Sequence, residues 1–171
     1  MKKEISDNIC NETLFASLFK KHSKNLYDFL YYKFGDTFNP KDKVQDAFIT
    51  LWENCHKISP SKAKSYLFTV ANNLTLNATA HQKVVLKYQQ HKPKDITHEN
   101  PEFVLEEKEY LEKLENAIAD LSEAQRVAFL LNRIEGKKHK EIAEILNIST
   151  KAVEKRIYGA LKKLRTQIDG L

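Results

Sequence analysis

The chain has 171 residues, and its 28 lysine and arginine residues outnumber 23 acids, which gives a formal net charge of +5. This basic excess favours a polyanionic partner, because cationic side chains bind phosphates and release condensed counterions. No stretch approaches the ~20 consecutive apolar residues of a membrane span, and the N-terminal MKKEISDNIC lacks the apolar segment of a secretory signal. We therefore expect a cytoplasmic protein with no membrane insertion of its own.

The first predicted element is a long amphipathic helix, because apolar residues recur at spacings of three and four from Phe15 to Phe34. It is expected to end near Gly35. Asn39 and Pro40 then supply a cap and a first-turn proline for a second helix. The buried stripe of this second helix is expected to consist of Val44, Ala47, Phe48, Leu51 and Trp52.

A third helix is predicted after the loop ISPSKA, beginning near Ala63 or Tyr66 and continuing to about Tyr88. The next residues, QQHKPKDITHENP at 89–101, are polar, contain two prolines and show no apolar period, which is typical of a linker. An acidic helix follows, and Ser122 with Gln125 then forms the capping box of the next one.

The segment KEIAEILNISTKAVEKRIYGALKKL at 140–164 predicts two short helices with a break between them. Asn147 suits the left-handed position that ends a helix, and the hydroxyl of Ser149 can cap the next one. This is the pattern of a helix-turn-helix, although an αα-hairpin that only packs would look alike. The outer face of the second helix is mostly basic, which favours DNA recognition, since that helix enters the major groove.

These elements predict an all-α chain of two helical domains, at 10–88 and 108–169, joined by a flexible linker at 89–107. Nucleotide-binding, hydrolase and metalloprotease motifs are absent from the sequence, so we expect no enzyme, no cofactor and no metal site. Cys10 and Cys55 form no CxxC pair and are expected to be free thiols in a reducing compartment.

Taken together, the motifs resemble the extracytoplasmic-function (ECF) sigma factors of bacterial RNA polymerase, over about residues 12 to 167. DKVQDAFITLW is similar to the family's second conserved helix, and SYLFTVANNLTLN to its promoter-melting helix. The segment from LSEAQ to KKLR is similar to its fourth region. The resemblance implies three partners: core RNA polymerase, promoter DNA and a membrane-associated anti-sigma factor.

The resemblance also assigns residues to each contact. Docking on core polymerase would use the polar face of the second helix, namely Asp42, Gln45, Asp46 and Glu53. The minus-ten element would meet residues around the third helix, namely Lys62, Lys64, Tyr66, Asn72, Asn73 and Lys83. The minus-thirty-five element would meet the last helix, through Lys151, Glu154, Lys155, Arg156, Tyr158 and Lys162.

The sequence departs from the family pattern at three positions of the third helix. Tyr66 stands where the family usually has Trp, and Asn77 and Ala80 replace an acid and a basic residue. The following run AHQKVVLKY suggests a Bacteroidetes-type subfamily variant in which Lys83 and Lys87 contact phosphate. Every basic residue before Arg126 is lysine, so bidentate arginine recognition of guanine is not expected in the first domain.

Two other functions remain open at this point. A free-standing helix-turn-helix regulator would bind its site tightly without polymerase, whereas a sigma factor should need the core enzyme. A helical adaptor without a DNA role would explain the amphipathic helices. It would not explain two basic blocks, at 1–88 and 116–171, on either side of an acidic stretch.

Overall fold

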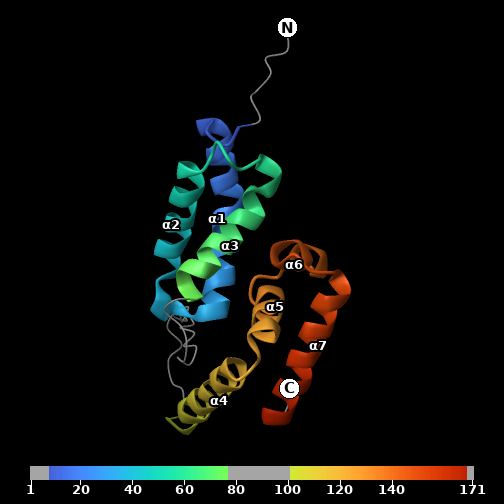
Figure 1. Cartoon of the computed structure of the whole chain (residues 1–171). Coiled ribbons are helices and arrows are strands. Elements are labelled where there is room, and N and C mark those ends of the chain that lie inside the picture. Colours follow the sequence, from blue (N-terminus) through green and yellow to red (C-terminus); the bar gives the residue numbers. More distant parts are fainter. Residues whose placement is uncertain (1–7, 77–100, 169–171) are drawn as a thin grey trace. The chain divides into compact units, whose positions relative to one another are not determined.

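The computed structural model describes residues 8–76 and 101–168, and within these ranges every regular element is a helix. The chain divides into two compact units, residues 1–82 and 83–171, which are described separately below (Figure 1). The all-α fold expected from the sequence is confirmed. In the described ranges, no helix is both long and apolar enough to cross a membrane.

The first unit is a bundle of three helices, α1 (Glu12–Phe34), α2 (Pro40–Glu53) and α3 (Pro60–Leu76). Each of the three packs against the other two. A single 3-10 turn, η1 (Asp36–Phe38), connects α1 to α2. The predicted end of α1 is confirmed, because the Gly35 amide, at φ 82°, donates to the carbonyl of Tyr31.

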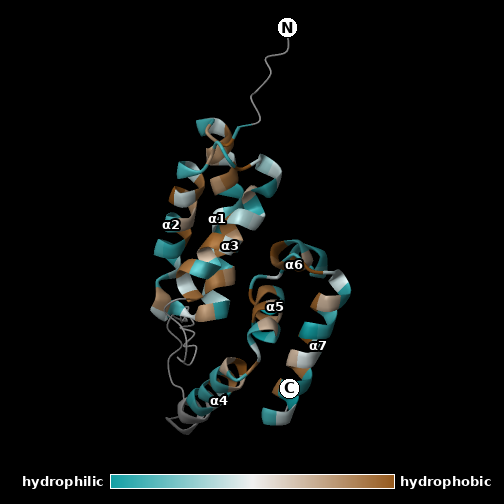
Figure 2. Cartoon of the chain, viewed as in Figure 1, coloured by the Kyte–Doolittle hydropathy of each residue, from teal (hydrophilic) through white to brown (hydrophobic). Residues whose placement is uncertain are grey.

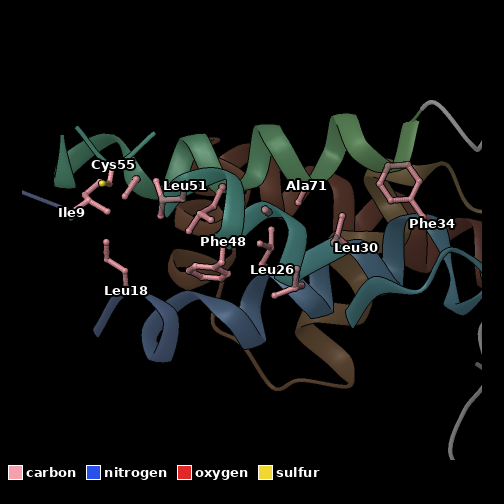
Figure 3. Packing of buried hydrophobic residues seen from close by; sticks show 13 residues of the cluster. Ile9, Leu18, Leu26, Leu30, Phe34, Phe48, Leu51, Cys55 and Ala71 are labelled. Carbon is pink, nitrogen blue, oxygen red and sulfur yellow. The ribbon is translucent and has the colours of Figure 1, made fainter. Parts of the chain in front are cut away.

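The core of this unit forms where one apolar stripe from each helix meets the other two (Figures 2 and 3). Leu26, Leu51, Leu67 and Ala71 are fully buried there, and Ile9 adds a side chain from the turn before α1. Burying a leucine side chain stabilises a fold by about 1.5–3 kcal/mol, so this shared core accounts for the cohesion of the three helices.

Two helix starts differ from their predictions. Asn39 does not cap α2 with its side chain, because its own backbone is left-handed, with φ at 48°. Pro40 does occupy the first turn, as predicted. Helix α3 begins at Pro60 instead of Ala63 or Tyr66, since a proline at the first helical position has no amide to satisfy and a φ already suited to a helix.

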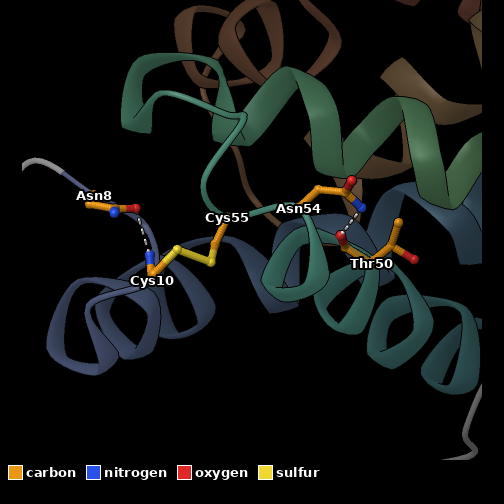
Figure 4. Close-up of a disulfide and its surroundings, with 5 residues drawn as sticks. All are labelled: Asn8, Cys10, Thr50, Asn54 and Cys55. Carbon is orange, nitrogen blue, oxygen red and sulfur yellow. Dashed lines mark hydrogen bonds between the residues drawn. A yellow bond between two sulfur atoms is a disulfide. The ribbon is translucent and has the colours of Figure 1, made fainter.

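A disulfide joins Cys10 to Cys55, so the expectation of two free thiols was wrong (Figure 4). Cys10 lies in the turn before α1, and Cys55 lies in the turn after α2. Their Cα atoms are 5.1 Å apart although 45 residues separate them in sequence. Sequence spacing could not reveal the pair, because only the packing of α1 against α2 brings the two turns together.

The second unit contains α4 (Pro101–Ala119), α5 (Glu123–Arg133), α6 (His139–Leu146) and α7 (Thr150–Gln167). Helix α7 packs against α4, α5 and α6. Helix α4 begins at Pro101, inside the range expected to be linker. At the predicted capping box, the hydroxyl of Ser122 accepts from the amide of Gln125, but the Gln125 side chain contacts that hydroxyl and not the backbone.

The predicted break between α6 and α7 is confirmed at both residues. Asn147 is left-handed, with φ at 54°, and its amide donates to the carbonyl of Ala143. Ser149 caps α7, since its hydroxyl oxygen accepts from the amide of Ala152 at 3.2 Å. The two helices are therefore separated by a turn of three residues, 147–149.

We expect Asn147→Ala to lower the free energy of unfolding of the second unit by about 1 kcal/mol, because a Cβ disfavours the left-handed region. Asn147→Gly should be tolerated, since glycine adopts this conformation without that cost. Urea unfolding followed by circular dichroism measures both variants. Asn39→Ala, at the other left-handed asparagine, is the matched control and should affect only the first unit. Equal stability of Asn147→Ala and Asn147→Gly would contradict the argument.

Candidate nucleic-acid interface and protein-binding surface

The outer face of α7 presents the side chains that the sequence assigned to DNA. Val153, Ile157 and Leu164 are buried against the rest of the second unit, and this fixes which side of α7 faces solvent. The opposite side exposes Lys151, Glu154, Lys155, Tyr158 and Lys162. Tyr158 is 71% exposed, so its ring and hydroxyl are free to meet a ligand, whereas Arg156 is half-buried at the margin of this face.

Glu154 has a neighbour that the sequence did not suggest. Its carboxylate lies 3.7 Å from Nδ1 of His139, the first residue of α6. Both side chains are substantially exposed, so this contact contributes little to stability. This contact links α7 to α6.

Arg126, the first arginine of the chain, has a structural role. Its guanidinium is buried and donates to the carbonyls of Ala119 and Leu121. The first carbonyl belongs to the last residue of α4, where a helix leaves acceptors without partners, and the second belongs to the turn that follows. Burial lowers the pKa of Arg126 from its usual value. This residue therefore stabilises the α4–α5 turn and is not placed to contact a ligand.

The predicted minus-ten residues of α3 divide between two sides of the helix. Ala63, Leu67 and Ala71 mark its buried side. Lys62 and Asn73 lie together on the opposite side by helical spacing, and Tyr66 lies beside them at the edge of the core, against which it packs. Lys62 and Asn73 are exposed there, and Tyr66 is half-buried.

Lys64 and Asn72 lie apart from this group. The ammonium group of Lys33, on α1, donates to the side-chain oxygen of Asn72 at 2.7 Å. Lys64 is half-buried near His22. Burial, with lesser contributions from Lys21 and Lys64, lowers the pKa of His22. Lys83, Lys87, Asn77 and Ala80 lie outside the described residues.

The predicted docking residues share the outer face of α2. Asp42, Asp46 and Glu53 recur at helical spacing along it, and the carboxylate of Asp46 lies 3.5 Å from the ammonium group of Lys43. Gln45 is exposed beside this row. Acidic side chains therefore recur on this face from the first turn of α2 to its last residue.

An apolar groove of about 540 Å³ borders this acidic face. It lies between Phe15 and Phe19 of α1 and Gln45, Ile49 and Trp52 of α2. Trp52 is 40% exposed, which corrects its placement in the buried stripe. We call the acidic row and this groove the α2 face.

The sequence contained a signal for this groove. Val44, Ala47, Phe48 and Leu51 already form one buried side of α2, so Ile49 falls outside it by helical spacing. Ile49 is 57% exposed. Exposed apolar side chains gathered beside polar ones are typical of protein-binding surfaces.

Two family models match the chain, each within one unit. Residues 18–84 match sigma-70 region 2, and residues 111–164 match sigma-70, region 4. The first region contains most of α1 with α2 and α3, and the second contains the helix-turn-helix.

Three curated relatives match over most of their length. The ECF RNA polymerase sigma factor RpoE of Cereibacter sphaeroides is 26% identical over 91% of this chain and 86% of its own. The ECF RNA polymerase sigma factor SigW of Bacillus subtilis is 24% identical, covering 94% and 92%. The ferric citrate uptake sigma factor FecI of Escherichia coli is 26% identical, covering 86% and 87%.

Among solved structures, CnrH in complex with the cytosolic domain of CnrY superposes with a TM-score of 0.52. It is 23% identical and the match covers 91% of this chain and 88% of that one. At 23% identity, this likeness supports the helical fold of the chain and nothing further.

Proposed function

The chain belongs to the ECF sigma factors of bacterial RNA polymerase, and from that membership we propose which of its surfaces binds which partner. The first unit binds core polymerase through the α2 face and the minus-ten element through α3. The second unit binds the minus-thirty-five element through α7. The chain itself catalyses no reaction, and catalysis is the role of the polymerase.

One observation carries the assignment of the second unit. The helix after the turn at Asn147 exposes Lys151, Lys155 and Lys162 on the side away from its packed residues. In a helix-turn-helix, the start of the second helix meets base edges in the major groove, and basic residues further along meet phosphates. An αα-hairpin that only packs has no need of such a face.

Promoter melting would use the outer side of α3. Extruding one base from the stack costs a few kcal/mol, and stacking on an aromatic ring offsets about 1–3 kcal/mol of it. Tyr66 supplies a ring beside Lys62 and Asn73, which suit a phosphate and a base edge. We therefore assign Tyr66 to the unstacked base.

We also propose that a partner protein binds this sigma factor and holds it inactive. CnrH was solved with the cytosolic domain of CnrY, and a membrane-associated anti-sigma factor with such a domain would fit this chain. A cytoplasmic location follows from binding to polymerase and to that domain. The apolar groove of the α2 face would accept an amphipathic helix, a common mode of peptide recognition.

The deciding experiment asks whether the purified chain co-elutes with core RNA polymerase and starts transcription in vitro. Promoter binding should be weak for the chain alone and strong for the assembled holoenzyme. A free-standing regulator would instead bind its site tightly without the core enzyme. Failure to co-elute and to initiate would reject the proposal.

The α2 face gives a mutational test. Gln45→Ala combined with Asp46→Ala should weaken core binding about tenfold, because polar contacts at a desolvated interface contribute about 1–2 kcal/mol. Folding should be unchanged, since the Lys43–Asp46 pair lies at the surface, in contact with solvent, and contributes little. Core affinity and the urea midpoint are measured on the same preparation.

The matched control for that test is Glu109→Ala combined with Glu112→Ala. Both are exposed acids on α4 in the other unit, and their removal should leave core affinity unaltered. Normal affinity and a normal midpoint in the Gln45, Asp46 variant would remove these residues from the docking surface.

A further inference from the structure

The disulfide marks a place where two turns of the first unit are held together. Cys10 precedes α1, and its amide donates to the side-chain oxygen of Asn8 at 3.1 Å. Cys55 follows α2 and is buried (Figure 4). Neighbouring Ile9 is fully buried in the core, so the position of Cys10 is fixed by packing as well as by the sulfur bond.

A third potential ligand stands at the same place. The ligand atoms of Cys10, Cys55 and His56 all lie within 4.8 Å of one another. His56 is exposed, so a small rotation of its ring is unhindered. Within the described ranges, these three residues are the one set of cysteine, histidine or acidic side chains whose ligand atoms are close enough to share a metal ion.

The donor set matches one class of cation. Zinc binds thiolate sulfur at about 2.3 Å and imidazole nitrogen at about 2.0–2.1 Å in tetrahedral geometry. Neighbouring ligands of such a tetrahedron are therefore about 3.3–3.8 Å apart. Once the sulfur bond is broken, shifts of about 1 Å in each ligand atom would move the two sulfurs apart and the His56 nitrogen closer, to that spacing.

We propose that, once the disulfide is reduced, Cys10, Cys55 and His56 bind a zinc ion, with water as the fourth ligand. Disulfides are rare in the bacterial cytosol, where small thiols keep cysteines reduced. Two small thiols give two electrons to the sulfur bond, which yields two protein thiols and one small disulfide. Zinc then replaces the two thiol protons and binds neutral His56.

The metal then joins the same two turns as the disulfide does. Both states tie the start of α1 to the end of α2, and the two states exclude each other because a disulfide sulfur is a poor zinc ligand. A small disulfide that takes two electrons from the thiolates, and so becomes two small thiols, re-forms the protein disulfide and therefore releases the ion. Trp52 lies three residues before Cys55 and packs on Phe15, with ring centroids 4.9 Å apart, so its fluorescence should respond to the exchange.

The test is a metal titration of the full chain after reduction and removal of metal. Cobalt(II) is the probe, because thiolate ligands give it intense near-ultraviolet charge-transfer bands and tetrahedral geometry gives visible bands. We expect saturation at one equivalent, displacement of cobalt by zinc, and a zinc dissociation constant below about 1 µM. The oxidised protein should give no bands.

Two variants identify the ligands. Cys10→Ser should abolish the charge-transfer bands or halve them, and His56→Ala should weaken zinc binding at least about tenfold. His139→Ala is the matched control, because His139 is a surface histidine of the other unit, and it should bind zinc normally. Absence of cobalt–thiolate bands in the reduced protein would overturn the proposal. An unchanged zinc affinity in His56→Ala would overturn it equally, by showing only an adventitious two-thiol site.

Discussion

Reduction of the Cys10–Cys55 disulfide in metal-free buffer should lower the free energy of unfolding of the first unit by about 4 kcal/mol, the chain-entropy value for a loop of this length. The two cysteines are 45 residues apart in sequence, so the bond excludes many extended conformations of the unfolded chain. The closed loop contains the whole of α1 and of α2. Few single contacts in a domain of this size have a comparable effect.

The only tryptophan of the chain makes this measurement specific. Trp52 belongs to α2, so its fluorescence reports urea unfolding of the first unit alone. A chelator keeps zinc out of the comparison. Cys10→Ala combined with Cys55→Ala is the control, and its midpoint should not respond to the reductant. If oxidised and reduced wild-type protein unfold at the same urea concentration, the disulfide does not stabilise the fold.

The end of α1 and the turn between α6 and α7 could be predicted because their determinants are local. The turn between α6 and α7 depends on one left-handed residue and one cap, and Asn147 and Ser149 are suited to those roles in any context. The apolar period of α7 likewise determined which residues are buried. Such features depend on neighbours within one or two turns, so a single sequence is sufficient to predict them.

Three of the features that the sequence did not predict depend on contacts between helices. Trp52 is apolar, yet it stays partly exposed in the groove that α2 forms with α1. The disulfide exists because α1 and α2 pack with the two turns at the same end. Asn72 looked available for DNA, but Lys33 of α1 donates to its side chain. Each of these outcomes needs the tertiary arrangement.

The site assignments depend partly on spacing along one helix and partly on the packing of two helices. Helical spacing alone separates Lys62 and Asn73 from the buried side of α3, and it places Lys64 elsewhere. The amino-acid types of the α2 face indicate an acidic row, whereas the apolar groove beside it requires Phe15 and Phe19 from α1. A surface formed by two helices is predictable only after their packing is known.

Glu154→Ala should change the preferred minus-thirty-five sequence by about 1–3 kcal/mol at one base pair. Glu154 lies in the first turns of α7, between the packed residues Val153 and Ile157. An acid beside phosphates costs affinity, so its presence on a basic face points to a specific use. A carboxylate that accepts from the amino group of cytosine is one such use.

The alternative use of Glu154 is its contact with His139 at 3.7 Å, and three variants separate the two. If Glu154 recognises a base, only Glu154→Ala should alter the base preferences found by selection from a promoter library, whereas His139→Ala should keep them. If the acid serves only that contact, both variants should keep the wild-type preferences.

Lys162→Ala, further along the exposed face, should weaken all promoters alike and reduce the salt slope of binding by about one. Base recognition by Glu154 is rejected if its removal leaves the selected minus-thirty-five sequence unaltered while Lys162→Ala lowers affinity as expected, because the assay would then have detected a DNA contact and found none at Glu154.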